Sequence, residues 1–168
     1  MAVGLYVYSY RISDLIERFK LGDNYFFRNR GESEITGIEL ETSFVIGNGL
    51  ELNAGAHYLR GEVVDDDSPT DGVPAPGVFM TLRGSPGTRW WWMARGAAYG
   101  RDDRPGPTEQ EVPGYAVLDA GAGFSITDWL EVSLLGRNLL DRADLASSDE
   151  DAVLAPGRSI QLVLRGRL

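Results

Sequence analysis

Eight amphipathic segments, each alternating apolar and polar residues at a period of two, follow one another along this 168-residue chain. In residues 159–168, for example, Ile160, Leu162 and Leu164 alternate with polar residues such as Gln161. A period of two is that of a β-strand with one apolar and one polar face, so the sequence predicts an all-β fold. The predicted strands cover residues 2–12, 35–46 with a start near 25–27, 50–59, 78–83, 90–99 or 90–101, 115–126, 130–139 and 159–168.

The connections between these segments alternate between tight turns and long loops. The turns contain glycine, asparagine, proline and aspartate, which allow sharp reversals of the chain. Short turns on one rim and long loops on the other are typical of an antiparallel up-and-down meander in an outer-membrane-type barrel. We therefore expect one β-barrel domain over residues 1–168, either closed as a small barrel or forming a segment of a larger one. The turns cover residues 47–49, 84–87 and 127–128, and the loops cover 13–24, 61–77, 102–114 and 141–157.

The choice between membrane and water depends on the two faces of these strands. If the face that carries Leu162 contacts lipid, a shift of one residue would place Arg165 there, and an arginine near the bilayer midplane costs about 2–4 kcal/mol. Trp90, Trp92 and Trp129 lie beside short turns, where an interfacial aromatic girdle is expected. The alternative is that these tryptophans cap the core of a soluble β protein. Together with the loop alternation, the pattern favours a barrel in contact with outer-membrane lipid.

Composition narrows the function classes. The formal net charge of −9 argues against a nucleic-acid partner, whose phosphates require basic side chains. The absence of cysteine removes disulfides, thiolate nucleophiles and cysteine metal ligands. The residues that follow Met1 do not have the pattern of a signal peptide, so none is expected in this chain. No apolar run approaches the ~20 residues of a membrane-spanning helix, whereas a membrane-spanning strand needs only ~9–11.

No arrangement of residues predicts catalysis. The single histidine, His57, lies in the middle of a predicted strand with no nucleophile motif nearby, so we expect it to be a polar residue facing a barrel lumen. Glu39 and Glu41 share one strand face and are expected to line the same lumen. We therefore expect no enzymatic activity, no cofactor and no metal site.

Acidic residues gather in the long loops. Ca²⁺ binds oxygen ligands, so one interpretation is a Ca²⁺ site formed by residues 65–67 with Asp71, or by the run 148–151. Neither run has EF-hand spacing, and a solvated, charged surface is the preferred interpretation. If the rim of loops is functional, we expect it to dock a cationic or metal-chelate ligand. The candidate ligand-binding residues are then Asp65, Asp66, Asp67, Asp102, Asp103 and Asp149.

Four short motifs resemble segments of the barrels of TonB-dependent outer-membrane receptors. Their order and spacing are similar to those of that family over nearly the whole chain. Two positions depart from the family pattern, since Leu140 and the final Leu168 stand where its members have phenylalanine or another aromatic residue. The motifs are residues 29–41 (NRGESEITGIELE) following Asp14-Leu15-Ile16, residues 113–119 (PGYAVLD), residues 137–141 (RNLLD) and residues 155–158 (APGR).

The resemblance implies the C-terminal part of a receptor barrel of about 22 strands around a plug, in the outer membrane of a Gram-negative-type cell. It implies uptake of a scarce nutrient of the siderophore-iron or cobalamin class, with this chain supplying barrel wall and extracellular loops. No plug domain is expected within the chain, and TonB would be contacted only through a missing N-terminal part. Two alternatives stay open: a self-contained eight-stranded outer-membrane barrel with a structural or adhesive role, and a soluble lipocalin-like ligand binder with an apolar interior.

Overall fold

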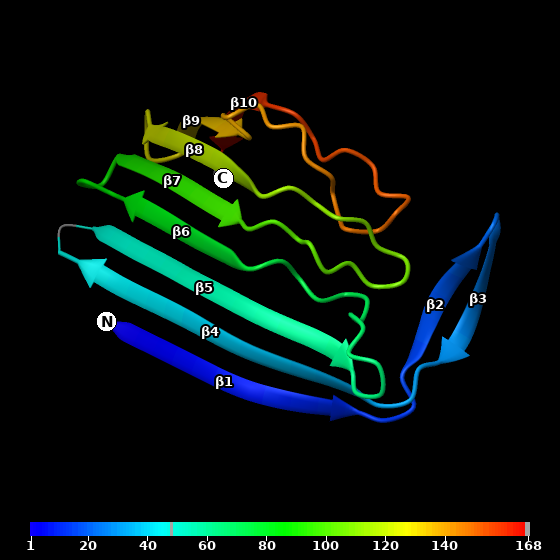
Figure 1. Cartoon of the computed structure of the whole chain (residues 1–168). Helices are drawn as coiled ribbons and strands as arrows, with labels where there is room; N and C mark the ends of the chain where they lie inside the picture. The colour runs from blue at the N-terminus through cyan, green and yellow to red at the C-terminus, as the bar shows by residue number, and fades with distance from the viewer. Residues whose placement is uncertain (48, 167–168) are drawn as a thin grey trace.

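A computed structural model describes residues 1–47 and 49–166 of the chain. These residues form ten β-strands, which confirms the predicted all-β class. No helix within the described ranges is long and apolar enough to cross a membrane. Figure 1 shows a curved sheet with loops extending from one of its ends. The strands are β1 (Ala2–Ile12), β2 (Ile16–Leu21), β3 (Asn24–Asn29), β4 (Ser33–Ile46), β5 (Leu50–Val63), β6 (Gly77–Gly84), β7 (Trp90–Tyr99), β8 (Tyr115–Ser125), β9 (Leu130–Arg137) and β10 (Ser159–Gly166).

Eight strands form one sheet in the order β1-β4-β5-β6-β7-β8-β9-β10, and β2 pairs with β3 in a separate two-stranded sheet. Every neighbouring pair in the large sheet is antiparallel, as the predicted up-and-down meander requires. In the part of the chain that the structure describes, β1 and β10 do not pair with each other. Of the two expected forms, the closed small barrel is therefore wrong for this chain, and the open segment of a barrel wall is confirmed.

The first long loop differs from the prediction, because it contains half of a β-hairpin. β2 and β3 pair along their whole length and are joined through Gly22, whose φ is 61°. The aromatic residues 25–27 therefore belong to this hairpin and not to the strand that continues as β4. Asp14 (φ 55°) and Gly31 (φ 82°) turn the chain on either side of the hairpin. Few residues accept this left-handed region, and the two turns separate the hairpin from the large sheet.

The other predicted boundaries are close to the observed ones. β5 continues to Val63, which shortens the loop after it. β9 ends at Arg137, because the next residue, Asn138, has a φ of 47°. Asn48, in a predicted turn, and residues 167–168, at the end of the last predicted strand, lie outside the described residues.

The strand register gathers the apolar residues of all eight strands on one side of the large sheet. This side is exposed, since Leu134 and Leu162 have 54% and 68% of their surface accessible, whereas Ser133 on the opposite side has 7%. An exposed apolar face and a more covered polar face suit lipid outside and a lumen inside, the reverse of a soluble lipocalin-like binder. One row of partners across six strands reads Leu5, Leu40, Ala56, Val78, Ala98 and Ala116.

The apolar face has a defined height. On β4 it runs from Ile38 to Ile46, a length of about 26 Å at the usual rise per strand residue, which matches the apolar band of outer-membrane barrels. Toward the long loops, the face ends in a charged row in which Arg11 is the partner of Glu34 and Glu34 is the partner of Glu62. The change from apolar to charged rows marks one limit of the lipid-facing zone.

Aromatic residues mark the opposite limit, at the rim with the short turns. Trp90 and Phe124 are partners on the exposed apolar face, and their ring centroids are 4.5 Å apart. Trp92 lies on the same face, and Trp129, in the turn before β9, is 59% exposed. The three tryptophans that the sequence assigns to an aromatic girdle therefore stand at one rim, as such a girdle requires.

Aromatic rings cover glycines at several strand pairs. Tyr8 lies over its partner Gly37, 2.5 Å from the place where a Cβ would stand, and donates a hydrogen bond to Glu39 at 2.6 Å. A glycine leaves a gap in the strand surface, and a neighbouring ring that fills it restores packing. These pairs fix the orientation of the rings on the sheet. The other pairs of this kind are Phe79 over Gly55, Trp91 over Gly123 and Trp92 over Gly84.

The most buried side chains lie at the rim with the long loops. Val63 and Ser33 are partners at the loop ends of β5 and β4 and are 1% and 0% exposed. Glu17 in the hairpin and Thr108 in a loop are also buried. Buried polar groups need hydrogen-bond partners, so the loops at this rim pack against one another and are not independent.

Candidate functional site

Four segments project from the same end of the large sheet (Figure 1). They are residues 13–32, which contain the β2–β3 hairpin, and residues 64–76, 100–114 and 138–158. We call these segments the rim loops. Hydrogen bonds and ion pairs join all four, which makes them the candidate functional site.

A clasp of polar groups closes the base of the hairpin. The Asn29 side chain donates to Asp14 at 3.0 Å and accepts a hydrogen bond from the Gly31 N–H at 2.7 Å. The backbone N–H groups of Leu15 and Arg30 donate to the carbonyls of Gly31 and Leu15, at 2.9 and 2.7 Å. The first of the four sequence motifs therefore has a structural role, since its residues hold the two ends of the hairpin together.

A second clasp closes the base of residues 138–158. The Asn138 amide donates to the carbonyls of Arg142 and Pro156, at 2.8 and 3.2 Å. Asp141 accepts hydrogen bonds from the backbone N–H and the guanidinium of Arg158, at 3.3 and 3.1 Å. The motifs at 137–141 and 155–158 are thus parts of one structure.

A buried ion pair lies at the base of the hairpin, and both of its side chains also contact the next rim loop. Arg30 Nη1 lies 3.0 Å from Glu17 Oε2, and the two side chains are 9% and 5% exposed. The other Glu17 oxygen accepts a hydrogen bond from the backbone N–H of Asp71 at 2.8 Å. Arg30 also donates to Ser68 and lies 3.7 Å from Asp66. Burial raises the pKa of Glu17, while the hydrogen bond from Asp71 and the charge of Arg30 act in the opposite direction.

Two acidic side chains join the remaining rim loops. Asp71 accepts hydrogen bonds from the N–H and the hydroxyl of Thr108, at 3.1 and 3.0 Å. Glu109 accepts from the Gly72 N–H at 3.1 Å and from the Ser148 hydroxyl at 2.7 Å. These bonds connect three loops that are far apart in the sequence.

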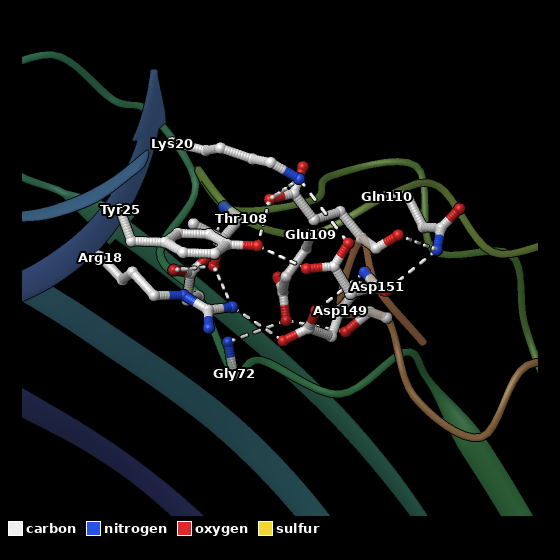
Figure 2. Close-up of polar contacts among 12 residues, drawn as sticks. Arg18, Lys20, Tyr25, Gly72, Thr108, Glu109, Gln110, Asp149 and Asp151 are labelled. Atoms are coloured by element: carbon white, nitrogen blue, oxygen red, sulfur yellow. Dashed lines mark hydrogen bonds and ion pairs between the residues drawn. The ribbon is translucent and has the colours of Figure 1, made fainter. Parts of the chain in front are cut away.

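The basic side of the hairpin meets an acidic run, residues 149–151, near the end of the chain (Figure 2). Arg18 and Lys20 from β2 and Tyr25 from β3 point toward this run. The Arg18 and Lys20 cations also lie over the Tyr25 ring, at 4.6 and 5.4 Å from its centroid, so the three side chains support one another. The contacts are 2.8 Å for Arg18 to Asp149, 3.1 Å for Lys20 to Glu150 and 2.5 Å for Tyr25 to Asp151.

Protonation equilibria respond to these contacts. The hydrogen bond from the Asp151 N–H, together with the contact to Arg18, lowers the pKa of Asp149. The hydrogen bond to Asp149 raises the pKa of the Arg18 guanidinium. Donation to Asp151 raises the pKa of the Tyr25 hydroxyl. All three shifts favour the protonation states that hold the hairpin against the acidic run.

A cavity of about 290 Å³ opens between three of the rim loops. Tyr99 and Tyr115, which are partners at the loop ends of β7 and β8, have ring centroids 4.8 Å apart and form part of its wall. Asp102 and Val112 also line it. Aromatic walls with one carboxylate are typical of small-molecule pockets.

The six predicted ligand-binding aspartates lie on three rim loops and do not form one cluster. Asp66 and Asp149 are partners of arginines, at 3.7 Å from Arg30 and 2.8 Å from Arg18. They hold the hairpin in place.

The other four candidates are less engaged. Asp65, Asp67 and Asp103 are exposed, and Asp67 has a φ of 54° in a turn. Asp102 accepts a hydrogen bond from the Arg104 N–H at 3.2 Å and lines the cavity. Among these four, Asp102 alone is part of the cavity wall.

The residues weighed for metal and lumen roles are placed as follows. Across residues 1–47 and 49–166, no group of three or more histidine, aspartate or glutamate side chains is able to hold a metal ion. Asp71, weighed as a Ca²⁺ ligand with 65–67, accepts from Thr108 instead. His57 lies on the polar side of the sheet, with Nε2 3.0 Å from the Ala75 carbonyl oxygen.

Sequence reasoning does not identify the basic half of this site, Arg18, Lys20 and Tyr25. Residues 13–24 contain polar and charged positions and are predicted to be a loop. The available signal is the short alternation Arg18-Phe19-Lys20-Leu21, followed by the turn at Gly22. This pattern is typical of a hairpin that stands outside the main sheet.

The family model described as TonB dependent receptor-like, beta-barrel, matches residues 2–139. The chain belongs to this family. The predicted resemblance is therefore confirmed over most of the sequence. Members of the family are Gram-negative outer-membrane transport receptors, and this TonB-dependent receptor barrel is accordingly an outer-membrane protein.

Three relatives of this TonB-dependent receptor barrel illustrate its size and fold. The pesticin receptor of Yersinia pestis is 26% identical over 122 residues, which are 68% of this chain and 18% of the receptor. The copper transporter OprC has a TM-score of 0.81 and 17% identity, over 98% of this chain and 28% of its own. The ferric yersiniabactin uptake receptor FyuA from Yersinia pestis has a TM-score of 0.80 and 21% identity, over 98% of this chain and 27% of its own. The chain thus spans less than a third of the length of each relative.

Proposed function

We propose that residues 1–168 are one β-barrel domain, supplying part of the wall and extracellular rim of an outer-membrane receptor for a siderophore-bound iron nutrient. The observation that supports this proposal is the combination of an exposed apolar face, a polar opposite face and interlocked loops at one rim. In this proposal the apolar face contacts outer-membrane lipid, the polar face lines the lumen, and the rim loops meet the ligand. The chain has no enzymatic role.

The choice of ligand class rests on the relatives, which are named for a pesticin, a copper and a ferric yersiniabactin function. Part of a metal chelate of the ferric-siderophore kind would contact the cavity between the rim loops, where Tyr99 and Tyr115 offer aromatic surface and Asp102 a hydrogen-bond acceptor. The exposed Asp65, Asp67 and Asp103 extend an acidic surface around it. This surface favours a neutral or cationic chelate over a strongly anionic one.

Energised uptake requires TonB, and the proposal assigns TonB contact to residues other than 1–168. Within this segment, the apolar face is assigned to lipid, the polar face to the lumen and the rim loops to the ligand. The pairing edges of β1 and β10 are assigned to other strands of the same receptor barrel, because unpaired strand edges are not stable in lipid.

Binding to the full-length receptor tests the function. Titration with ferric siderophores of the catecholate, hydroxamate and phenolate kinds is expected to give saturable binding with at least one of them, and Asp102→Asn and Tyr115→Ala are expected to weaken it. Asp128→Asn, in a short turn at the other rim, is the matched control and is expected to bind normally. Saturable binding of cyanocobalamin or Cu²⁺ with none of any ferric chelate would contradict the proposal.

A further inference from the structure

Two hollows meet at Tyr58 on the lipid-facing side of the large sheet. By register, Tyr58 belongs to the apolar face as the partner of Ile38, and it is 53% exposed. One hollow, of about 550 Å³, extends to β6 and β7, and the other, of about 520 Å³, extends to β1. Tyr58 and Ile38 line both of them. The surface that contacts lipid is therefore recessed around these two side chains.

Small side chains form much of the larger hollow. Ala56 and Ala98 are the partners of Val78 in one row of the sheet, and all three line the hollow. Pro76 and Gly100 line it in the next row, where the Gly100 N–H donates to the Pro76 carbonyl at 2.7 Å. Lipid hydrocarbon surrounds this face of the sheet, so a chain is held in a recess by van der Waals packing. The hollow therefore fits a flexible acyl chain.

A polar cavity of about 130 Å³ adjoins the larger hollow on the side of the long loops. Tyr58 and Pro76 line both spaces, so apolar and polar surroundings meet there. Arg60, the next residue of β5 on the same face, lines the polar cavity and is the partner of Thr36. Two residues of an antiparallel strand span only about 7 Å, so one ligand reaches both spaces. The ligand that fits is an amphiphile, with its headgroup toward the loops.

The polar cavity contains both arginines and carboxylates. Arg60 Nε and Arg104 Nη2 lie 2.9 and 3.3 Å from the same oxygen of Glu62, so one carboxylate faces two guanidinium groups. These arginine side chains are 49% and 35% exposed, and exposed ion pairs are weak enough to share a guanidinium with a phosphate. Asp102 and Asp103 line the same cavity, and carboxylates accept hydrogen bonds from sugar hydroxyl groups. The headgroup that fits therefore carries phosphate and hydroxyl groups together.

We propose that this surface binds one lipid A molecule, with acyl chains in the two hollows beside Tyr58 and a phosphate at Arg60 and Arg104. The long loops of outer-membrane barrels are extracellular, so the site lies at the height of the outer leaflet. Lipid A is the glycolipid of that leaflet, and it carries several acyl chains on a phosphorylated disaccharide. Tyr58 stands at the border between chains and headgroup, where tyrosine is common in membrane proteins.

Native mass spectrometry of the full-length receptor in detergent measures this binding. Receptor freed of co-purified lipid is titrated with lipid A and, separately, with phosphatidylethanolamine. Ala56→Phe with Ala98→Phe fills the larger hollow and is expected to remove one bound lipid A relative to the unchanged receptor. Arg60→Gln is expected to weaken that binding about tenfold, as for the loss of a hydrogen bond between charged groups. Phosphatidylethanolamine is expected to bind less than lipid A and to be insensitive to Arg60→Gln.

Two controls make the result specific. Ala94→Phe with Ala122→Phe enlarges residues of the same face outside the hollows and is expected to keep the bound lipid A. Lipid A without its phosphates is expected to bind equally to the Arg60→Gln and unchanged receptors. Lipid A retained in full by the Ala56→Phe, Ala98→Phe receptor, or phosphatidylethanolamine retained as well as lipid A, would overturn the proposal. The titration contains no ferric siderophore, so its outcome does not depend on the proposed function.

Discussion

Arg158 donates two hydrogen bonds to Asp141, from its backbone N–H at 3.3 Å and from its guanidinium at 3.1 Å, and so ties the start of β10 to the end of β9. The hairpin base repeats this solution with Asp14 and Asn29, joined at 3.0 Å. In both places an aspartate with positive φ sits where a long segment leaves the wall. Aspartate tolerates that backbone and offers an acceptor to the returning chain.

Replacement of Asp141 tests this clasp. Asp141→Ala is expected to destabilise the protein by about 2–3 kcal/mol, because it removes the acceptor for Arg158 and places an alanine at a φ of 54°. Asp141→Asn retains an acceptor and a tolerant backbone and is expected to cost less. The measurement is urea unfolding in lipid vesicles, with limited proteolysis of residues 138–158. Equal losses in the two variants would show that the backbone and the acceptor do not matter here.

The close contact between Tyr8 and Gly37 predicts that a larger residue at position 37 destabilises the barrel wall. Gly37→Ala would place a methyl group 2.5 Å from the Tyr8 ring and displace it from Glu39, so a loss of about 1–3 kcal/mol is expected, as for overpacked cores. Gly96→Ala is the control, because no atom lies within 4 Å of the added carbon. The fraction of protein that keeps its folded, heat-modifiable form on a gel reports the difference. A Gly37→Ala protein as stable as Gly96→Ala would contradict the packing role of Tyr8.

The buried pair Glu17 and Arg30 predicts a large effect at the hairpin base. Glu17→Ala leaves Arg30, 9% exposed, without its partner and is expected to destabilise the rim by about 3–5 kcal/mol. Glu17→Gln keeps an acceptor for the Asp71 N–H and removes only the charge, so a smaller loss is expected. Hydrogen exchange of the hairpin amides measures the effect. Protection factors unchanged in Glu17→Ala would show that the pair carries no stability.

The contact between the β2–β3 hairpin and residues 149–151 predicts a pH dependence with a definite sign. The pKa of Asp149 is lowered from its ordinary value of 3.8, so its contribution is fully present above that pH and is lost as pH falls through the lowered pKa. The pKa of Tyr25 is raised from 10.0, so its contribution is present below pH 10 and is lost as pH rises through the raised pKa.

The protection of the hairpin amides against hydrogen exchange is therefore expected to stay constant between these limits and to fall at both extremes. Asp149→Asn is expected to weaken the acid transition, while Asp103→Asn, which does not contact the hairpin, leaves it in place. An acid transition of the same size in Asp149→Asn would assign it to another group.

The orientation of the last strand predicts opposite results for adjacent residues. Leu162, 68% exposed on the apolar face, is expected to tolerate arginine poorly, at about 2–4 kcal/mol if it lies near the bilayer midplane. Gln161, on the polar face, is expected to accept arginine with little change. Folding into vesicles of defined lipid measures both variants. If Gln161→Arg were the more damaging change, the assignment of the two faces would be reversed.

The wall is predictable from the sequence because it depends on local alternation. The period-two pattern places Leu134 and Leu162 on the same face before any contact is known, and the register makes them partners. Once the face is fixed, the tryptophans at the short turns and the charged row that includes Arg11 follow from it. The β2–β3 hairpin is the exception, because an alternating pattern does not indicate which sheet a strand joins.

The rim is not predictable in the same way, because its contacts depend on the curvature of the whole sheet. Arg18 and Asp149 are 131 residues apart in the chain, and no local pattern pairs them. Asp66 and Asp149 are visible as acidic positions, but their arginine partners belong to other loops. The sequence therefore shows where the charged residues of the rim loops lie, whereas the structure shows which of them are paired with an opposite charge.

The pairing of β1 with β4 is continuous up to Ile12 and Ser33, as though the twenty residues between them were a simple turn. The pairing of β1 with β4 therefore does not depend on which segment is inserted between them, provided that the two ends of that segment are held together. Segments of different length and chemistry are then exchangeable at this position without rebuilding the barrel. Such independence lets recognition diversify from one receptor to another while the membrane-spanning frame is inherited unchanged.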